Sequence, residues 1–317
     1  MMSRADRVRG VLLGTAAGDA LGAPYEFQPP RGPELPVEMV GGGPWEPGEW
    51  TDDTAMALAI AEVAAAGADL RDAAAQDAIV ARWFEWSLGA KDVGIQTRHV
   101  LSAAGHGGAI TAERARTAAT AEHERTGRSG GNGSLMRVLP LVLVHQGPVD
   151  LLIAQAHRQS QVTHAHPRAQ ACCALYCLWA WFELQQHPEP WPQAVQVLTG
   201  YYARMPEGAV YQDEVNQHLR PLDHEPLTRS HCGGSGYVVD TLRSARWACQ
   251  AEDYRAVMRR AIGLGHDTDT TACIAGGIAG LRCGLTQLPT ALVQGLRGQT
   301  EWLAPLQQQL LCYWRDQ

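Results

Sequence analysis

The sequence lacks an apolar run long enough to cross a lipid bilayer. Its longest uninterrupted apolar stretch, Ala171 to Phe182, has 12 residues, whereas a membrane-spanning helix needs about 20. The first residues of the chain also lack the long apolar region and small-residue cleavage site of a secretory leader. We therefore expect a soluble, cytoplasmic protein with no membrane partner.

An excess of positive charge is also missing. The chain has 26 Lys and Arg against 33 Asp and Glu, which gives a net charge of −7. An acidic surface disfavours nucleic acid, so we expect no nucleic-acid partner, although a nucleotide-sized ligand can still bind in a local pocket. The eight cysteines include no CxxC pair. Most of them lie in apolar helical patterns, as free buried thiols in a reducing compartment do.

Alternating, strand-like patterns are scarce as well. Only residues 137–145 are ambiguous, while Ala- and Leu-rich segments with helical spacing fill most of the chain. This pattern predicts an all-α fold, a compact multi-helix bundle. The length of 317 residues is near the upper size of one cooperative core. Because no shift in composition marks a boundary, we expect a single domain over residues 1–317, and a monomer.

Helical spacing and breaker residues together predict where the helices lie. The predicted helices are 3–21, 53–66, 71–88, 111–126, 134–146, 149–161, 167–186, 191–203, 236–250, 252–264, 268–283, 288–297 and 301–315. Residues 23–50 are so rich in proline and glycine that no regular element is expected there. Residues 204–235 are also predicted to be irregular. A loop as long as 23–50 in a compact protein is usually functional or disordered.

Two short clusters of oxygen-bearing side chains stand at the start of apolar helices. The clusters are Thr51, Asp52 and Asp53, and Asp267, Asp269 and Thr270. Helix capping is the simpler interpretation, since Thr and Asp are preferred at helix starts. One cap needs only one residue, however, and each cluster supplies three. If the two helices pack side by side, four carboxylates and two hydroxyls converge.

Four carboxylates in a partly buried site do not stay ionised together without cations. Ligand sets made only of oxygen favour Mg²⁺, Ca²⁺ or Mn²⁺. The absence of His and Cys from both clusters counts against zinc. Interior glycines at 276, 277 and 280 weaken the helix behind the second cluster, so they indicate close approach of another backbone. The clusters therefore predict a site for hard cations, with two ions sharing ligands as a typical hydrolytic arrangement.

Seven motifs follow one another along nearly the whole chain. They are GTAAGDALGAPYEF (14–27), WTDDTAMAL (50–58), KDVGIQT (91–97), GGNGSLMRVLPL (130–141), THAHPRA (163–169), SGYVVDTL (235–242) and GHDTDTTACIAGGIAG (265–280). In this order and spacing the chain resembles the ADP-ribosylglycohydrolase family, most closely the dinitrogenase reductase-activating glycohydrolase type. The resemblance implies an all-α fold with a cleft that holds two Mg²⁺ or Mn²⁺ ions. The metal ligands of the family fall on the six residues of the two clusters.

The resemblance also implies a reaction and a partner. The reaction is hydrolysis of the bond between C1″ of the distal ribose of ADP-ribose and an acceptor atom. The partner is an ADP-ribosylated protein or a small ADP-ribose conjugate. Arginine-linked ADP-ribose is the first choice, and serine, O-acetyl and nucleobase linkages stay open. Two other functions also stay open: a non-catalytic ADP-ribose-binding or toxin-immunity protein, and a metal-dependent phosphohydrolase.

The resemblance also implies roles for three single residues. Glu26 and Asp92 fall on family carboxylates near the metals, and both are candidates for acid–base catalysis. We do not divide the acid and base roles between them. The alternative for Glu26 is a solvated loop residue, and the alternative for Asp92 is a residue of a helix C-terminus or turn. Tyr237 is a candidate for stacking on adenine, with core packing as an equal alternative.

The Gly-rich turn before residue 134 is the expected phosphate-binding segment. Glycines and helix-start amides suit phosphate, and the resemblance places this turn on the pyrophosphate and distal ribose. The substrate-binding candidates are Gly131, Asn132, Gly133, Ser134 and His164. We expect Ser134 at a helix start, Arg137 one turn inside that helix, and His166 as a cap or scaffold residue.

Three features depart from the family pattern. Ile95 stands where relatives can carry a polar residue that contacts the ligand. His266 stands where a glycine is common, and its role is open between ligand contact and crowding of the cleft. Residues 206–232 follow no pattern that we can interpret, and we expect them to influence the choice of acceptor.

Overall fold

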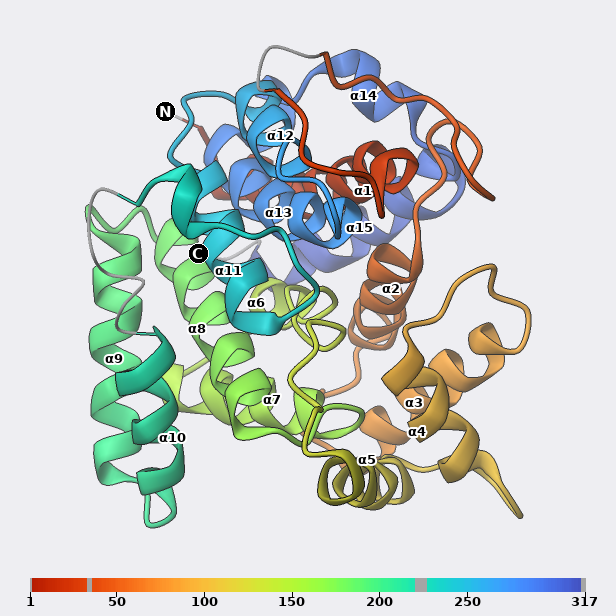
Figure 1. Cartoon of the computed structure of the whole chain (residues 1–317), viewed down its shortest axis with the longest axis vertical. Coiled ribbons are helices and arrows are strands. Elements are labelled where there is room, and N and C mark those ends of the chain that lie inside the picture. Colours follow the sequence, from red (N-terminus) through yellow and green to blue (C-terminus); the bar gives the residue numbers. More distant parts are fainter. Residues whose placement is uncertain (1, 33–35, 220–226, 315–317) are drawn as a thin grey trace. The chain divides into compact units, whose positions relative to one another are not determined.

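The chain is built from helices (Figure 1). The structure is a computed structural model that describes residues 2–32, 36–219 and 227–314. Within these ranges no β-strand occurs, and Gly42 and Trp45 form an isolated bridge. The predicted all-α class is confirmed. None of the helices in the described part of the chain combines the length and hydrophobicity that a membrane span requires.

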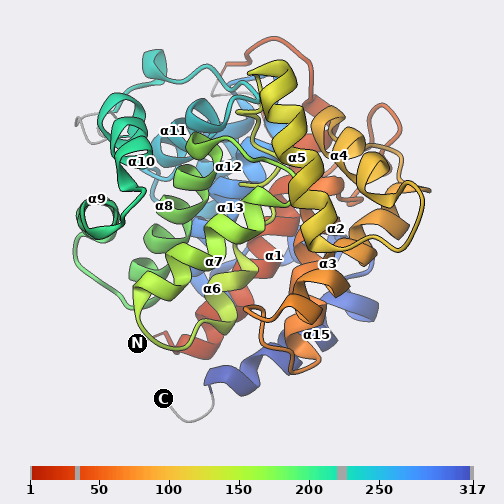
Figure 2. The same ribbon diagram turned by 90° about the horizontal axis from the view of Figure 1, so that it is seen from below.

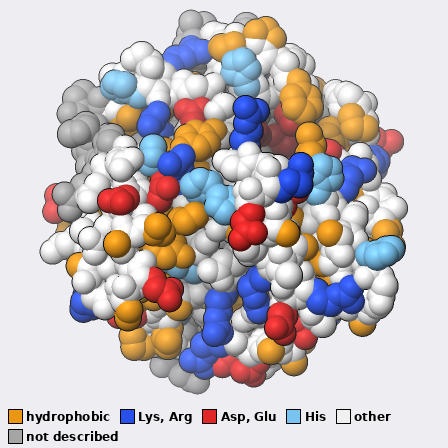
Figure 3. All heavy atoms as spheres, turned by 60° about the horizontal axis from the view of Figure 1, so that its bottom comes forward, with side chains coloured by type: hydrophobic (Ala, Val, Ile, Leu, Met, Phe, Trp, Pro, Cys, Tyr) orange, Lys and Arg blue, Asp and Glu red, His pale blue; other side chains and the backbone are white. Residues whose placement is uncertain are grey.

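Contacts between residues divide the chain into two compact units. Unit 1 comprises Met1–Ala55, Glu183–His187 and His224–Gln317, and unit 2 comprises Met56–Phe182 and Pro188–Asp223. The single domain expected over residues 1–317 stays a prediction, and each unit is described by itself. Acidic and basic side chains are interspersed on the face drawn in Figure 3, as the modest negative net charge leads one to expect.

Unit 1 is organised around one long helix, α13, which is buried over residues 268–281. Its elements are α1 (Arg4–Gly22), η1 (Ala23–Tyr25), η4 (Arg229–His231), α11 (Val238–Ala248), α12 (Tyr254–Ile262), α13 (Thr268–Gln287), α14 (Thr290–Gly295), η5 (Gln299–Leu303), α15 (Ala304–Leu310) and η6 (Leu311–Trp314). Helices α1, α11 and α12 pack against α13. The chain kinks inside α13 at Gly284, whose φ is +62°. Figure 1 shows α1 and α13 side by side in the same unit.

Helix α2 (Asp52–Ala65) begins in unit 1 and continues in unit 2. The other helices of unit 2 are α3 (Ala73–Ser87), α4 (Ile95–Gly105), α5 (Ala112–Thr126), α6 (Pro140–Val144), α7 (Val149–Gln161), α8 (Pro167–Leu184, whose last two residues belong to unit 1), α9 (Pro190–Arg204), α10 (Gly208–Glu214) and η2 (Val215–Leu219). Figure 2 shows α3, α4 and α5 together, as their mutual contacts require. Helix α8 carries a continuous buried apolar segment over residues 171–180.

The boundaries of several helices differ from the prediction. The helix expected over 134–146 is wrong, because residues 133–137 form turns and helix α6 starts only at Pro140. Proline is well suited to a first helical position, where it needs no N–H partner. Ser134 is therefore not at a helix start, and Arg137 is not inside a helix. Arg137 instead lies fully buried in the turn.

Two helices lie where none was predicted. Helix α4 occupies residues expected between two helices, and α10 lies inside the segment 204–235 that was expected to be irregular. Of the uninterpreted segment 206–232, residues 220–226 lie outside the described residues. The loop 23–50 behaves as expected, since no element longer than the short η1 forms within its described part.

Candidate functional site

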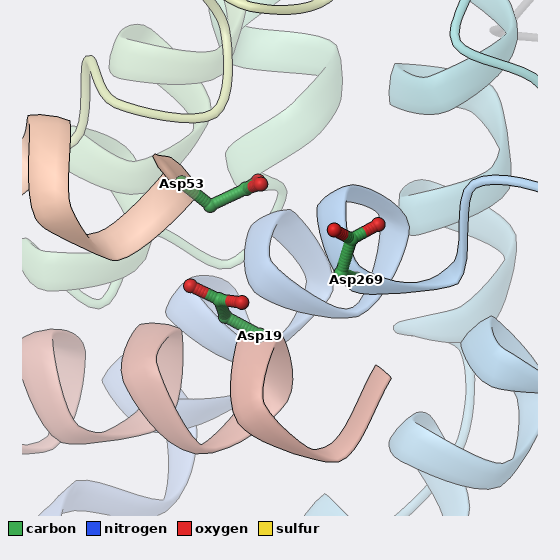
Figure 4. A group of neighbouring side chains, drawn as sticks. All are labelled: Asp19, Asp53 and Asp269. Carbon is green, nitrogen blue, oxygen red and sulfur yellow. The ribbon is translucent and has the colours of Figure 1, made fainter. Parts of the chain in front are cut away.

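Three carboxylates of unit 1, each from a different helix, converge (Figure 4). Asp19 comes from α1, Asp53 from the first turn of α2 and Asp269 from the first turn of α13, and their side chains point toward one another. One oxygen atom of each lies within 4.8 Å of the other two. All three side chains are buried. A metal ion could bind among these oxygens.

A second group of carboxylates shares one member with the first. Oxygen atoms of Glu26, Asp267 and Asp269 also lie within 4.8 Å of one another. Glu26 and Asp267 are half-buried, so this group is the more open of the two. Asp269 belongs to both groups, and a carboxylate with two oxygens can bridge two cations.

Asp19 is the residue that sequence analysis missed. It is fully buried, and its carboxylate accepts hydrogen bonds from the backbone N–H groups of Thr51 (3.0 Å) and Thr54 (3.0 Å) and from the Thr54 hydroxyl (2.6 Å). A carboxylate of α1 thus caps α2 from a distant part of the chain. A usable signal was present, since Asp19 is the sole charged residue between positions 10 and 25.

The capping by Asp19 leaves Asp53 available for another role. The hydroxyls of Thr51 (3.1 Å) and Thr270 (3.4 Å) both donate to Oδ2 of Asp53. Its other oxygen, Oδ1, is completely enclosed and has no hydrogen-bond partner among the described residues, and the same holds for Oδ1 of Asp269. Enclosed oxygens without donors are costly unless a proton or a cation is bound. The donor set therefore fits hard metal ions.

Burial and mutual repulsion raise the pKa values of these carboxyl groups. Burial raises the pKa of Asp19 to about 6, against the opposing effect of its hydrogen bonds from Thr54 and Thr51. The pKa of Asp53 is raised well above its usual value by burial and then by the charge of Asp19. The pKa of Asp269 is raised in the same way, by burial and then by Asp53. These shifts are the electrostatic cost that a bound cation would remove.

Close packing of α1 on α13 brings the carboxylates together. A methyl group added at Gly14 would lie 2.4 Å from the carbonyl oxygen of Gly276, and one added at Gly18 would lie 2.1 Å from that of Ala272. Only glycine allows the two backbones to approach this closely. The predicted close approach of another backbone is confirmed for Gly276 and Gly280, and that backbone belongs to α1.

The position of Asp52 agrees with the expected cluster, although neither carboxylate trio includes it. It lies in the first turn of α2, and its side chain is buried. Its charge is one of the causes that raise the pKa of Asp53. The six predicted ligand residues are therefore close in unit 1, and their role as ligands stays a prediction.

Two backbone hydrogen bonds join His266 to the residues that follow Glu26. The N–H of Phe27 donates to the carbonyl of His266 (2.6 Å), and the N–H of His266 donates to the carbonyl of Gln28 (2.8 Å). Both Phe27 and His266 have a φ of +61°, which is uncommon for residues other than glycine. This reciprocal pairing lies next to both Glu26 and Asp267. It gives a structural role to the backbone at position 266, the one residue of its motif that the resemblance did not explain.

Tyr237 follows a glycine that lies beside Asp267 of the second carboxylate group. It is the residue before α11, and its side chain is 38% exposed, which argues against simple core packing. The preceding residue, Gly236, is so close to Asp267 that an added methyl group would lie 3.0 Å from Oδ2. The N–H of Asp267 also donates to Gly234 (2.9 Å). The stacking role of Tyr237 stays a prediction.

The other predicted ligand-binding residues gather within unit 2. Methyl groups added at Gly131 and Gly133 would lie 3.6 Å and 3.2 Å from Nε2 of His164. Asn132 is buried, and its carbonyl accepts from the N–H groups of residues 135 and 136. Ser134 is fully buried, and its hydroxyl is 2.8 Å from that of Ser160. The hydroxyl of Ser134 is therefore already engaged.

Three further residues of unit 2 were singled out in the sequence. Asp92 is half-buried in the loop before α4, and its role beside the metals stays a prediction. Ile95, at the start of α4, is 77% exposed. His166 behaves as the expected cap, because its Nδ1 accepts from the N–H of Arg168 at 3.0 Å in the first turn of α8.

Fold and site together define an all-α protein with a buried acidic cluster that could hold metal ions. The profile of the ADP-ribosylglycohydrolase family matches residues 1–317. The chain belongs to the ADP-ribosylglycohydrolase family.

Several relatives and a solved structure are similar over most of the chain. ADP-ribosylarginine hydrolase Tri1 of Pseudomonas putida (strain GB-1) is 31% identical over 91% of this chain and 74% of its own length. The namesake in Serratia proteamaculans (strain 568) is 29% identical over 96% and 79%. The ADP-ribosyl-[dinitrogen reductase] glycohydrolase of Rhodospirillum rubrum is 30% identical over 93% and 92%. A structure described as an "ADP-ribosylglycohydrolase-related protein complex" superposes with a TM-score of 0.74 at 29% identity and 99% coverage of both chains.

Proposed function

We propose that this protein hydrolyses the C1″ glycosidic bond between ADP-ribose and an acceptor and releases free ADP-ribose. ADP-ribosyl-arginine on protein is the first-choice substrate, so the reaction would reverse mono-ADP-ribosylation. Two similar proteins are named ADP-ribosylarginine hydrolases. The observation that carries the proposal is the pair of carboxylate trios that share Asp269.

Two divalent cations, Mg²⁺ or Mn²⁺, are the proposed cofactors. Asp19, Asp53 and Asp269 would hold one of them, and Asp267 together with Asp269 would hold the other, with Glu26 beside it. Bound cations supply Lewis acidity and neutralise charge that develops during the reaction. The enclosed Oδ1 atoms of Asp53 and Asp269 support this assignment, because they lack donors among the described residues.

The chain's own residues would position the sugar and move protons. Glu26 is half-buried at the open side of the cluster, where a carboxylate can take a proton from water or give one to the leaving group. Asp92 is the second candidate for this work. The turn at Gly131 and Gly133, with His164, would bind the pyrophosphate and distal ribose, and Tyr237 would stack on the adenine.

One product assay tests this proposal. Purified protein is incubated with Mg²⁺, Mn²⁺ or EDTA and a panel of arginine-, serine-, O-acetyl- and nucleobase-linked ADP-ribose, and released ADP-ribose is measured. We expect release from the arginine linkage with Mg²⁺ or Mn²⁺ and none with EDTA. We expect Asp269→Asn to lower the rate at least about 100-fold, which is the size of loss that follows removal of one group that stabilises charge in the transition state. Asp213→Asn is the matched control, since Asp213 is exposed on α10.

The same assay separates the competing functions. Binding of ADP-ribose without release of it from any linkage would indicate a non-catalytic binding protein. Release of inorganic phosphate from ADP-ribose would indicate a phosphohydrolase. Full activity of Asp269→Asn with EDTA present would refute the proposed role of the acidic cluster.

A further inference from the structure

His164 takes part in a buried chain of hydrogen bonds that the proposed reaction does not explain. A guanidinium nitrogen of Arg137 lies 2.6 Å from Oγ1 of Thr163, and this oxygen lies 2.8 Å from Nδ1 of His164. All three side chains are buried, with relative exposures of 0%, 0% and 2%. The direction of each hydrogen bond follows from the chemistry of the groups.

The first bond has only one possible direction. A guanidinium stays protonated in proteins and carries donors but no acceptor. Arg137 therefore donates, and Oγ1 of Thr163 accepts. The guanidinium is itself held in place, since its Cζ lies 3.9 Å from the ring centroid of Trp83. A second contact of the same nitrogen reaches the carbonyl of Gln159 at 3.4 Å.

The second bond then follows from the single hydroxyl proton of Thr163. Within the described part of the chain, the sole acceptor beside this hydroxyl is Nδ1 of His164. If Nδ1 carried a proton, the hydroxyl proton of Thr163 would be buried without an acceptor, which costs free energy. Thr163 therefore donates to a bare Nδ1. A neutral imidazole with a bare Nδ1 carries its proton on Nε2.

We propose that Arg137, acting through Thr163, fixes His164 as a neutral imidazole that presents its Nε2–H to an acceptor oxygen of the ligand. Arg137 and Thr163 are then positioning residues. That His164 contacts the ligand rests on the proposed function, whereas the assignment of its proton rests on the hydrogen bonds alone. Burial and the charge of Arg137 lower the pKa of His164 to about 3, in agreement with a neutral ring.

The surroundings of Nε2 suit a ligand oxygen. This nitrogen faces the backbone of Gly131 and Gly133, where side chains are missing. No hydrogen bond from Nε2 to the described residues is formed, and the atom is not among the fully enclosed polar atoms without a partner. An Nε2–H group that is held in one orientation can donate to a phosphate or hydroxyl oxygen of a ligand. It cannot bind ligand groups that have only donors.

The proton on His164 can be observed directly in the free protein. We expect ¹⁵N-detected NMR of the wild type to show a pyrrole-like Nε2 and a pyridine-like Nδ1 for His164, with the resonance assigned from its loss in His164→Gln. The reverse pattern, or a doubly protonated ring at neutral pH, would overturn the proposal. This measurement needs no ligand, so it stands even if the proposed glycohydrolase activity fails.

Binding of ADP-ribose provides the second test. Isothermal titration calorimetry with ADP-ribose is expected to show an affinity about tenfold weaker for Thr163→Val, because the fixed donor is lost. Thr163→Ser retains the hydroxyl and should bind within about twofold of the wild type. Thr117→Val, on the exposed face of α5, is the matched control. Equal affinity of Thr163→Val and wild type, with an unchanged His164 spectrum, would refute the positioning role.

Discussion

Gly18→Ala is the perturbation for which the structure gives the clearest expectation. The added Cβ would lie 2.1 Å from the carbonyl oxygen of Ala272, whereas ordinary contacts begin at 3.4 Å. The difference of 1.3 Å between these two values must come from separation of α1 and α13, because the obstructing atom is backbone in the interior of a helix. Gly18 is next to Asp19, and Ala272 is one turn from Asp269, so the separation would also widen the acidic cluster.

The two opposing effects of this change have different sizes. Alanine is favoured over glycine inside a helix by about 1 kcal/mol, whereas overpacking costs about 1–3 kcal/mol or more. The overlap with a backbone carbonyl belongs at the upper end of that range, so we expect a net loss of about 2 kcal/mol in the free energy of unfolding. For a chain of 317 residues, such a loss corresponds to a fall in Tm of roughly 3 °C.

Two measurements on the same samples test this reasoning. Thermal unfolding followed by circular dichroism gives the change in Tm, and titration with Mn²⁺ gives the affinity of the acidic cluster. We expect a loss of Mn²⁺ affinity of about tenfold or more, which corresponds to about 1.4 kcal/mol. Gly89→Ala is the matched control, since no atom lies within 4 Å of its added Cβ. An unchanged Tm and Mn²⁺ affinity for Gly18→Ala would refute the idea that glycine contacts set the cluster.

Three further predictions concern the site. With EDTA present, the Tm is expected to fall as the pH rises from 5 to 8. In the folded protein the pKa is raised for Asp19 (to about 6), Asp53 and Asp269. The folded state therefore holds these protons more tightly than the unfolded state, and the stability that they provide at low pH is lost as the three groups ionise. Scanning calorimetry should show a smaller fall for Asp53→Asn or with added Mn²⁺, and an equal fall in all samples would contradict this. Urea titration should show that His266→Val lowers the free energy of unfolding by about 1–2 kcal/mol, because a φ of +61° disfavours branched residues. His266→Gly should change the free energy of unfolding by less than about 1 kcal/mol, since glycine adopts this φ readily. Equal effects of the two substitutions would argue against backbone strain at this position. Gly133→Ala should weaken ADP-ribose binding with little change in Tm, because its Cβ would lie 3.0 Å from Cε1 of His164, and calorimetric binding equal to wild type would contradict this.

Much of the helical pattern could be predicted, because spacing of apolar residues reports directly on a buried helix face. Helix α7 over 149–161 agrees with its predicted bounds. The prediction failed where an apolar stretch was buried without being helical, as in the turn before Pro140. There Arg137 is buried against Trp83 and Thr163, and tertiary contacts of this kind override local preference.

The sequence by itself determined the all-α class and the two clusters at Thr51 and Asp267, since an excess of oxygen side chains over the needs of a cap is visible without a structure. Only the tertiary structure decided that Asp19 caps α2 from another helix and that Glu26 reaches the second group of carboxylates. The physical reason is that these contacts join residues far apart in the chain. They depend on how closely α1 approaches α13 and on the backbone hydrogen bonds of His266 with Phe27 and Gln28. The spacing of apolar residues along a helix predicts neither of these contacts.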